Sequence, residues 1–216
     1  HNPVGRVWTK EELLRIGTIC REHQVLVFSD EIHFDFIWGG EHHVFQEVDP
    51  AFREFTMTAT APSKTFNLAG LQQSNIFIPN EKIRKAFIRQ YQVSGLDEPN
   101  TFGIAATQAA YNHGDEWYEA MKKYVWENIC YAKEFIDERI PDVKMNLPEG
   151  TYLFWLDFRK LGLSADELED LIIHKAGLWL DSGRIFGKSG EGFQRINAAC
   201  PRSTLQEALE RIEKVL

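Results

Sequence analysis

The chain has 216 residues, of which 44% are hydrophobic and 26% are charged. This composition is typical of a globular protein with a packed core, and it excludes disordered and collagen-like classes. The formal charge of −8, with a sequence pI near 5.4, argues against a nucleic-acid-binding surface, which needs clustered positive charge. We therefore expect a small molecule as partner and no nucleic acid.

The cysteines and the apolar runs indicate the cellular compartment. Cys20, Cys130 and Cys200 are odd in number, far apart and form no CxxC pair, so neither a disulfide framework nor a zinc site is expected. No apolar run approaches the roughly 20 residues that a membrane-spanning helix needs, and no signal segment opens the chain. These features predict a cytoplasmic protein without membrane contact and without a metal. Residues 1–5 read as a turn inside a fold, which predicts that the chain is part of a longer protein.

The first predicted elements are a helix and a strand. Thr9 followed by Glu12 has the spacing of a capping box, and the apolar residues after it repeat with helical periodicity, which predicts a helix over 9–23. Residues 25–28 form a short, wholly apolar run that ends in polar residues including Asp30. This pattern is typical of a buried parallel strand that delivers polar side chains at its carboxyl end.

The elements that follow alternate between strand and helix, which implies a doubly wound sheet. After an excursion at the sheet edge over 34–50, we predict a strand at 55–60, a loop at 61–64, a strand at 74–78, a helix at 81–93 and a helical stretch over 101–139 broken near 112–115. The remainder is predicted as strands at 152–158, 178–180 and 194–198, with helices at 165–175 and 204–216, the last one capped by Ser203 or Thr204.

Three polar residues occupy positions where ligands of open α/β sheets collect. Asn2 precedes the first helix, Asp30 follows the strand at 25–28, and Lys64 follows the strand at 55–60. A lysine at such a place can form a Schiff base when burial lowers its pKa, and a nearby carboxylate can pair with a protonated ring nitrogen. From their spacing alone this chemistry is only suggested.

Four short motifs in a fixed order carry a resemblance to a known family. They are residues 2–5 (NPVG), 29–33 (SDEIH), 63–70 (SKTFNLAG) and 195–197 (RIN). In order and separation they resemble the motif set of the class I/II aminotransferases of fold type I. The resemblance implies an α/β fold like that of aspartate aminotransferase, with pyridoxal 5'-phosphate as cofactor. It also implies that 1–112 is the C-terminal part of the large doubly wound cofactor-binding domain, and that 113–216 is a smaller α+β C-terminal domain with a long connecting helix.

The resemblance assigns a role to individual residues. It implies that Lys64 forms the Schiff base with the cofactor, that Asp30 bonds the pyridine nitrogen, and that Asn2 donates to the phenolate oxygen. Ser63 is expected near the phosphate. Arg195 is expected to bind the substrate α-carboxylate through two parallel hydrogen bonds, which a lysine could not reproduce.

Two departures narrow the family. Aminotransferases commonly have Tyr where this chain has His33 and Arg where it has Gln72. Both differences resemble the MalY/PatB-like cystathionine β-lyase, or C–S lyase, branch, which makes β-elimination the leading hypothesis. His33 is then a candidate cofactor contact that either tunes the ring or packs beneath it. Without an Arg at position 72, other donors must neutralise the phosphate, and in this family they lie upstream of His1.

The leading functional hypothesis is cleavage of L-cystathionine or a related cysteine S-conjugate to a thiol, pyruvate and ammonia. An aminotransferase on the same scaffold is the first alternative. A non-catalytic ligand-sensing or regulator-binding domain is the second. The resemblance also implies an amino-acid substrate and a homodimer.

Structural roles remain open for several of these residues. Lys64 could be a surface lysine, Asp30 a turn or cap residue, and Arg195 part of a structural ion pair. His42 and His43 are interpreted as part of a solvated loop, because no carboxylate or cysteine partner suggests a metal. Aromatic residues at near-helical spacing are expected in the core or at a domain contact and are assigned no chemistry: Tyr118, Tyr124 and Trp126.

Overall fold

The computed structural model describes residues 1–96 and 98–216 and divides the chain into two compact units. The first unit is Val7–Glu119, and the second unit combines His1–Arg6 with Ala120–Leu216. Each unit contains its own β-sheet. The boundary between the two compact units lies between residues 119 and 120. The domain boundary expected between 112 and 113 stays a prediction.

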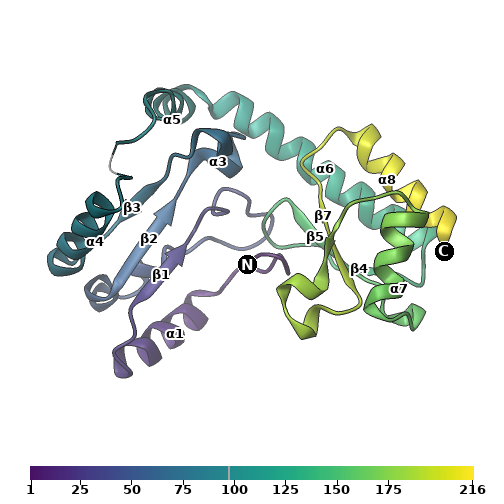
Figure 1. Cartoon of the computed structure of the whole chain (residues 1–216), viewed down its shortest axis with the longest axis horizontal. Coiled ribbons are helices and arrows are strands. Elements are labelled where there is room, and N and C mark those ends of the chain that lie inside the picture. The colour runs from purple at the N-terminus through teal and green to yellow at the C-terminus, as the bar shows by residue number, and fades with distance from the viewer. Residues whose placement is uncertain (97) are drawn as a thin grey trace. The chain divides into compact units, whose positions relative to one another are not determined.

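The sheet of the first unit has the strand order β1-β2-β3 (Figure 1). Strand β1 (Val27–Asp30) runs parallel to β2 (Thr56–Thr60), and β3 (Asn75–Phe77) runs antiparallel to β2. The strands predicted at 55–60 and 74–78 are confirmed. Strand β1 lies two residues later than predicted, so Asp30 is its last residue and not the residue after it.

Helix α1 (Lys10–Glu22) covers the sheet and begins where the sequence predicted. The capping box is present, since Glu12 N donates to Thr9 Oγ1 at 3.2 Å and Thr9 N donates to Glu12 Oε2 at 3.0 Å. Gly17 allows the helix to approach closely, because a Cβ there would lie 2.1 Å from the Phe52 ring. The residues that share this core are Leu13, Phe45 and Phe52, with Val27, Val48 and Phe55 packed against them.

The remaining helices of the first unit connect and flank the strands. Asn80 caps α4 by accepting from Lys82 N at 2.9 Å and Ile83 N at 3.1 Å, and α4 has the predicted bounds. The predicted break near 112–115 is confirmed, because α5 ends just before Gly114. These helices and 3₁₀ turns are α2 (Phe45–Val48), η1 (Pro50–Glu54), α3 (Pro62–Thr65), η2 (Ala69–Leu71), α4 (Glu81–Val93) and α5 (Thr101–His113).

A buried carboxylate holds the loop that follows β1. The side chain of Glu31 accepts from Ser29 Oγ at 2.9 Å and from Phe45 N at 3.0 Å, both through Oε1. Its Oε2 lies 2.8 Å from His42 Nε2. The interpretation of His42 as part of a solvated loop was wrong, because this histidine tethers the loop to a carboxylate that is only 6% exposed. Such a group retains its charge in the interior only when hydrogen bonds satisfy it.

The second unit has an antiparallel sheet with the order β4-β5-β7-β6. The strands predicted at 152–158 and 194–198 are confirmed as β5 and β7. The strand predicted at 178–180 is wrong in position, because pairing with β7 begins only at Asp181, opposite Arg195. The four strands are β4 (Lys144–Met145), β5 (Leu153–Asp157), β6 (Asp181–Ser182) and β7 (Phe193–Asn197).

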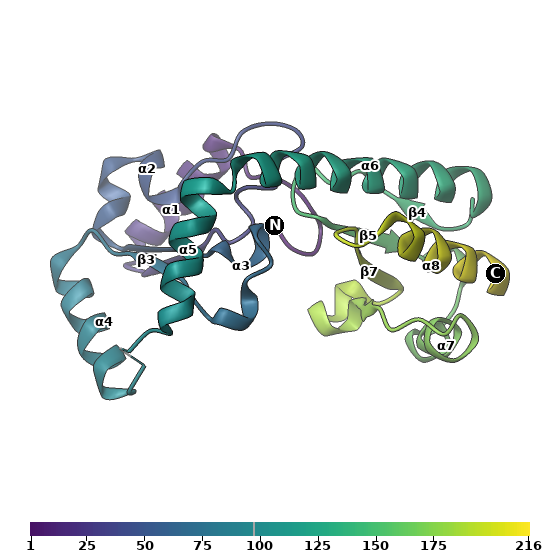
Figure 2. The same cartoon turned by 90° about the horizontal axis from the view of Figure 1, so that it is seen from above.

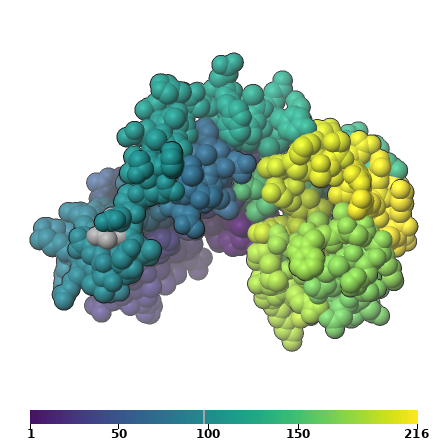
Figure 3. Space-filling model, turned by 45° about the horizontal axis from the view of Figure 1, so that its top comes forward, coloured from purple at the N-terminus to yellow at the C-terminus, as the bar shows by residue number. Residues whose placement is uncertain are grey.

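Figure 2 shows helix α8 running beside the later part of α6. The buried Asn128 of α6 joins them: its Nδ2 donates to Ala198 O and Cys200 O at 2.8 Å, and its Oδ1 accepts from Arg202 Nε at 2.6 Å. The space-filling view of Figure 3 shows α8, in yellow, at the surface. Its buried face consists of Leu205, Leu209 and Ile212.

The start of α8 differs from the prediction. The helix begins at Arg202 with Pro201 at the cap position, and no side chain caps it, so the expected Ser203 or Thr204 cap was wrong. A proline at this point sets the backbone for the helix that follows. Helix α6 (Asp115–Arg139) begins in the first unit and continues into the second. The other helices and turns of the second unit are η3 (Arg159–Leu161), α7 (Ala165–Asp170) with its π-helical extension η4 (Leu171–Lys175), η5 (Gly183–Phe186), η6 (Lys188–Gly190) and α8 (Arg202–Val215).

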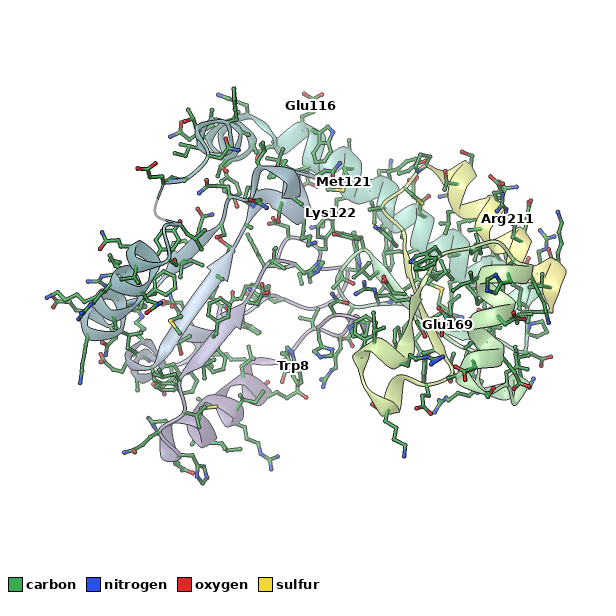
Figure 4. The ribbon with its side chains drawn as sticks, viewed as in Figure 1. Trp8, Glu116, Met121, Lys122, Glu169 and Arg211 are labelled. Atoms are coloured by element: carbon green, nitrogen blue, oxygen red, sulfur yellow. The ribbon has the colours of Figure 1, made fainter. Side chains whose placement is uncertain are left out.

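The predicted burial of the first strand was wrong. Phe28 of β1 is 54% exposed, and β1 pairs only with β2 among the described strands. Trp8, just before α1 (Figure 4), is 37% exposed. Other exposed apolar side chains of this region are Leu14, Ile16, Ile19, Val25 and Leu26. None of the helices in the described ranges is long and apolar enough to cross a membrane.

Replacing the α1 cap tests the capping box. We expect Thr9→Ala to lower the free energy of unfolding by about 1 kcal/mol, because the N–H of Glu12 loses its acceptor. Urea denaturation followed by far-UV circular dichroism measures this change. Thr18→Ala in the same helix is the matched control, since the Thr18 hydroxyl only donates back to Leu14 O. Equal stabilities of the two variants would contradict the prediction.

Replacing the buried carboxylate tests the loop anchor. We expect Glu31→Ala to destabilise the protein by about 3 kcal/mol, because Phe45 N–H and His42 are left without their acceptor. Glu31→Gln should cost clearly less, since its amide oxygen can keep the bonds from Ser29 and Phe45. The measurement is denaturant unfolding, and an alanine variant within about 0.5 kcal/mol of the parent would show that the anchor contributes little.

Candidate functional site

Asp30 and Lys64 lie at the same edge of the first unit's sheet. Asp30 ends β1 opposite Ala59 of the parallel strand β2, and Lys64 follows five residues after Ala59. Because the carboxyl ends of parallel strands meet at one sheet edge, the structure brings these two side chains to the same region. Both are exposed. A carboxylate and a primary amine are therefore available there to a ligand.

Lys64 lies within a single helical turn, whereas the sequence predicted a loop at 61–64. The turn is α3, with Pro62 as its first residue and Phe66 N donating to Pro62 O at 2.8 Å. Pro62 and Thr65 are buried, which leaves Lys64 facing outward. Within the described part of the chain, the Lys64 amine makes no hydrogen bond or ion pair.

Ser63 and His33 lie beside these two residues in the chain. Ser63 is half-buried, and its carbonyl oxygen accepts from Leu68 N at 3.1 Å. His33 is half-buried with its Nδ1 atom fully buried, and its carbonyl oxygen accepts from Phe36 N at 3.0 Å. Both belong to the loops that follow β1 and β2. Their contacts with a cofactor stay predictions.

Asp30 is held by its own loop. Its Oδ1 accepts from Ile32 N at 3.2 Å, which is a turn bond two residues ahead. This bond uses one carboxylate oxygen and leaves Oδ2 without a partner among the described residues. The structure thus combines the turn role that the sequence left open with an accessible carboxylate.

In the second unit, Arg195 lies within a polar cluster of three side chains. Its Nη1 donates to Asn2 Oδ1 at 2.6 Å, and its Nη2 and Nε donate to Asp181 Oδ2 at 2.5 and 3.1 Å. The guanidinium also lies 4.9 Å from the centroid of the Phe186 ring. The structure therefore brings the predicted residues Asn2 and Arg195 together, although they are far apart in sequence.

These contacts do not exhaust the hydrogen-bonding capacity of Arg195. A guanidinium carries five N–H groups in a rigid planar fork. The bonds to Asn2 and Asp181 leave one N–H on each terminal nitrogen. The Arg195 side chain is 17% exposed, so part of it is accessible to a ligand. Burial raises the pKa of the neighbouring Tyr152, and the charge of Arg195 opposes that rise.

Sequence reasoning missed three carboxylates that organise these groups. Glu31 anchors the loop after β1, Asp181 orients Arg195, and Asp35 accepts from Thr65 Oγ1 at 2.5 Å. Each is a single acidic residue whose partner is distant in sequence or on another strand. The sequence offered a clue only for Asp181. This residue lies opposite Arg195 in the β6–β7 pair, so a correct prediction of β6 would have indicated that the two side chains meet.

Comparisons with known proteins identify the family. Residues 1–212 match the family model described as aminotransferase class I and II. The cystathionine beta-lyase PatB of Bacillus subtilis is 43% identical over 217 residues, which is 100% of this chain and 56% of that protein. The structure of a PLP-bound putative aminotransferase from Clostridium difficile aligns with a TM-score of 0.97 and 46% identity over 100% of this chain and 56% of its own.

A second solved structure agrees. Cystalysin from Treponema denticola, which contains a pyridoxal 5'-phosphate cofactor, aligns with a TM-score of 0.96 and 44% identity over 100% of this chain and 55% of its own. These matches confirm the predicted α/β fold of the aspartate aminotransferase type. The chain spans about half the length of the relatives it matches, with 56% of PatB covered, and these coverages do not confirm the expected C-terminal position. The chain belongs to the aminotransferase class I and II family.

Proposed function

We propose that the protein is a pyridoxal-phosphate-dependent C–S β-lyase. The observation that carries this proposal is the placement of Asp30 and Lys64 at the ends of two paired parallel strands, both exposed. A primary amine fits the cofactor's aldehyde, and a carboxylate fits its ring nitrogen, so the donor set suits this cofactor. Pyridoxal phosphate, when bound, supplies a carbonyl for the substrate amino group and a ring that accepts electrons from Cα.

Lys64 and Asp30 perform different tasks in this proposal. The Lys64 amine would remove the proton from the substrate Cα. The Asp30 carboxylate keeps a proton on the ring nitrogen, because a negative charge at hydrogen-bond distance favours the protonated form. The turn bond from Ile32 N fixes the direction of that carboxylate. Ser63 is proposed to donate to the cofactor phosphate, and His33 to contact the ring.

Arg195 and Asn2 are proposed to handle the substrate carboxylate and the cofactor oxygen. The remaining N–H pair of Arg195 binds the α-carboxylate through two parallel hydrogen bonds. Asn2 accepts from Arg195 through its Oδ1. Its amide NH₂ group therefore points away from Arg195 and can donate to another acceptor. That orientation supports the expected bond from Asn2 to the phenolate oxygen.

The proposed reaction is β-elimination. After Lys64 removes the Cα proton, a thiolate leaves from Cβ, and addition of water to the remaining three-carbon fragment gives pyruvate and ammonia. For L-cystathionine the departing thiol is homocysteine. The cystathionine beta-lyase name of the PatB relative and the His33 and Gln72 residues support elimination. We further propose that the protein forms a homodimer and works in the cytoplasm.

Transamination is the alternative function on the same residues. This alternative is supported by the 46% identity to the solved structure of a putative aminotransferase. In this reaction Lys64 would remove the same Cα proton, but the amino group would pass to a keto acid and no thiol would leave. A requirement for keto acid therefore separates the two reactions.

Replacing the lysine tests the proposal directly. In the protein supplied with pyridoxal phosphate, we expect L-cystathionine to yield pyruvate without added keto acid, and Lys64→Ala to lower that rate at least about a thousandfold. Lys82→Ala, an exposed lysine on α4, is the matched control and should retain the parent rate. Pyruvate is measured with a coupled dehydrogenase. Amino-group transfer to a keto acid without pyruvate release would show that the protein is an aminotransferase and not a lyase.

Replacing the guanidinium tests the carboxylate contact. We expect Arg195→Lys to raise KM for L-cystathionine by about tenfold or more, because an ammonium group cannot donate two parallel hydrogen bonds. Arg184→Lys is the matched control, since Arg184 lies on the nearby turn η5 and is paired with Asp166 and Glu169. Steady-state kinetics measures both variants. An unchanged KM in the Arg195 variant would show that this residue does not bind the substrate carboxylate.

A further inference from the structure

A hydrogen bond links the loops that follow β1 and β2. Thr65 Oγ1 donates to Asp35 Oδ2 at 2.5 Å, and the Thr65 residue is only 2% exposed. Asp35 comes five residues after Asp30, and Thr65 directly follows Lys64. The bond therefore joins the two segments that present the proposed cofactor residues. A hydroxyl that donates to a carboxylate makes a short, charge-assisted bond.

Asp35 is itself fixed by a distant part of the first unit. Tyr118, at the start of α6, donates its hydroxyl to the backbone oxygen of Asp35 at 2.6 Å. Burial raises the pKa of Tyr111 on α5, and the negative charge of Asp35 adds to that rise. Asp35 is thus half-buried, and its backbone is held by a residue of α6. Among the described residues, the Asp35 side chain makes one hydrogen bond, which it accepts from Thr65 Oγ1.

The residue after Thr65 is held by the same helices. The ring centroid of Phe66 lies 6.0 Å from that of Tyr111, 5.7 Å from that of Trp117 and 6.5 Å from that of Tyr118. A Cβ at Gly114 would lie 2.5 Å from this ring, so the glycine leaves room for it. Thr65 and Phe66 are fixed, whereas Lys64 beside them is exposed and makes no bond among the described residues.

We propose that Asp35 and Thr65 are positioning residues for Lys64. Their hydrogen bond ties the backbone of α3 to the loop after β1, so the amine of Lys64 and the carboxylate of Asp30 keep a fixed separation. This inference rests on the proposed function. The bond is distinct from the apolar core of the unit, which lies around Phe45 and Phe52. Removing it should therefore loosen the lysine turn more than it unfolds the protein.

The test compares variants that differ in one hydrogen bond. Thr65→Val removes the hydroxyl while keeping the shape, Thr65→Ser restores it, and Asp35→Asn keeps an acceptor but removes the charge. Thr58→Val is the matched control, since Thr58 is also 2% exposed and its hydroxyl donates to Gln46 Oε1 at 3.1 Å, away from Lys64. Thermal unfolding is recorded for each variant to confirm that it folds.

Two readouts do not depend on turnover. Hydrogen exchange, measured without cofactor, gives the rate at which the amide hydrogen bonds of Phe66 and Leu68 open. These amides bond to Pro62 O and Ser63 O within the lysine turn. Pyridoxal phosphate is then added, and its Kd, the visible circular dichroism of the bound cofactor and borohydride trapping on Lys64 are measured. We expect Thr65→Val to speed exchange at both amides, to raise Kd about tenfold and to change the dichroism of the bound cofactor.

The outcomes separate this inference from the proposed function. Thr65→Ser should resemble the parent, and Asp35→Asn should fall between the parent and Thr65→Val. Parent-like exchange, Kd and dichroism in Thr65→Val would overturn the positioning role while Lys64 trapping still stands. If Thr65→Val does not fold, Asp35→Asn decides by the same readouts. Failure of borohydride to trap the cofactor on Lys64 of the parent would overturn the proposed function, and this inference with it.

Discussion

The parallel pairing of β1 with β2 is the constraint on which the candidate site depends. It aligns Asp30 with Ala59 and directs the two following loops to one edge of the sheet. The pairing sets the backbone positions of both segments, and the bond from Ile32 N then orients the Asp30 carboxylate. A shift of the pairing by one residue would turn every side chain of β1 to the opposite face, and Asp30 with them. The apolar contacts that fix the register lie beneath the strand, around Val27 and Phe52.

Acidic side chains hold the loops and the arginine that the strands present. Glu31 ties the loop after β1 to the residues around Phe45, and Asp35 ties the same loop to the lysine turn. Asp181 plays the corresponding part for Arg195 in the second unit. In each case a carboxylate holds a partner in a fixed direction through short, charge-assisted bonds. The chain thus uses negative charge for structure, in keeping with its net charge of −8.

The sequence could predict the features whose signals are local. The Thr9 capping box, the break at Gly114 and each of the four motifs depend on only a few neighbouring residues. The bond from Thr65 to Asp35 spans 30 residues, and no periodicity or spacing encodes it. The exposure of Phe28 was missed for a related reason, because an apolar run reports preference for burial and not whether another strand covers it. The roles of the site residues stay predictions.

The ion pair of Arg195 with Asp181 has a consequence for ligand recognition. A long cationic side chain that waits in solvent must give up its rotamer freedom when it captures an anion. Here Asp181 and Asn2 already hold the guanidinium at three of its N–H groups. The side chain thus loses this rotamer freedom when the protein folds, and the arginine is preorganised for the carboxylate that we propose it binds.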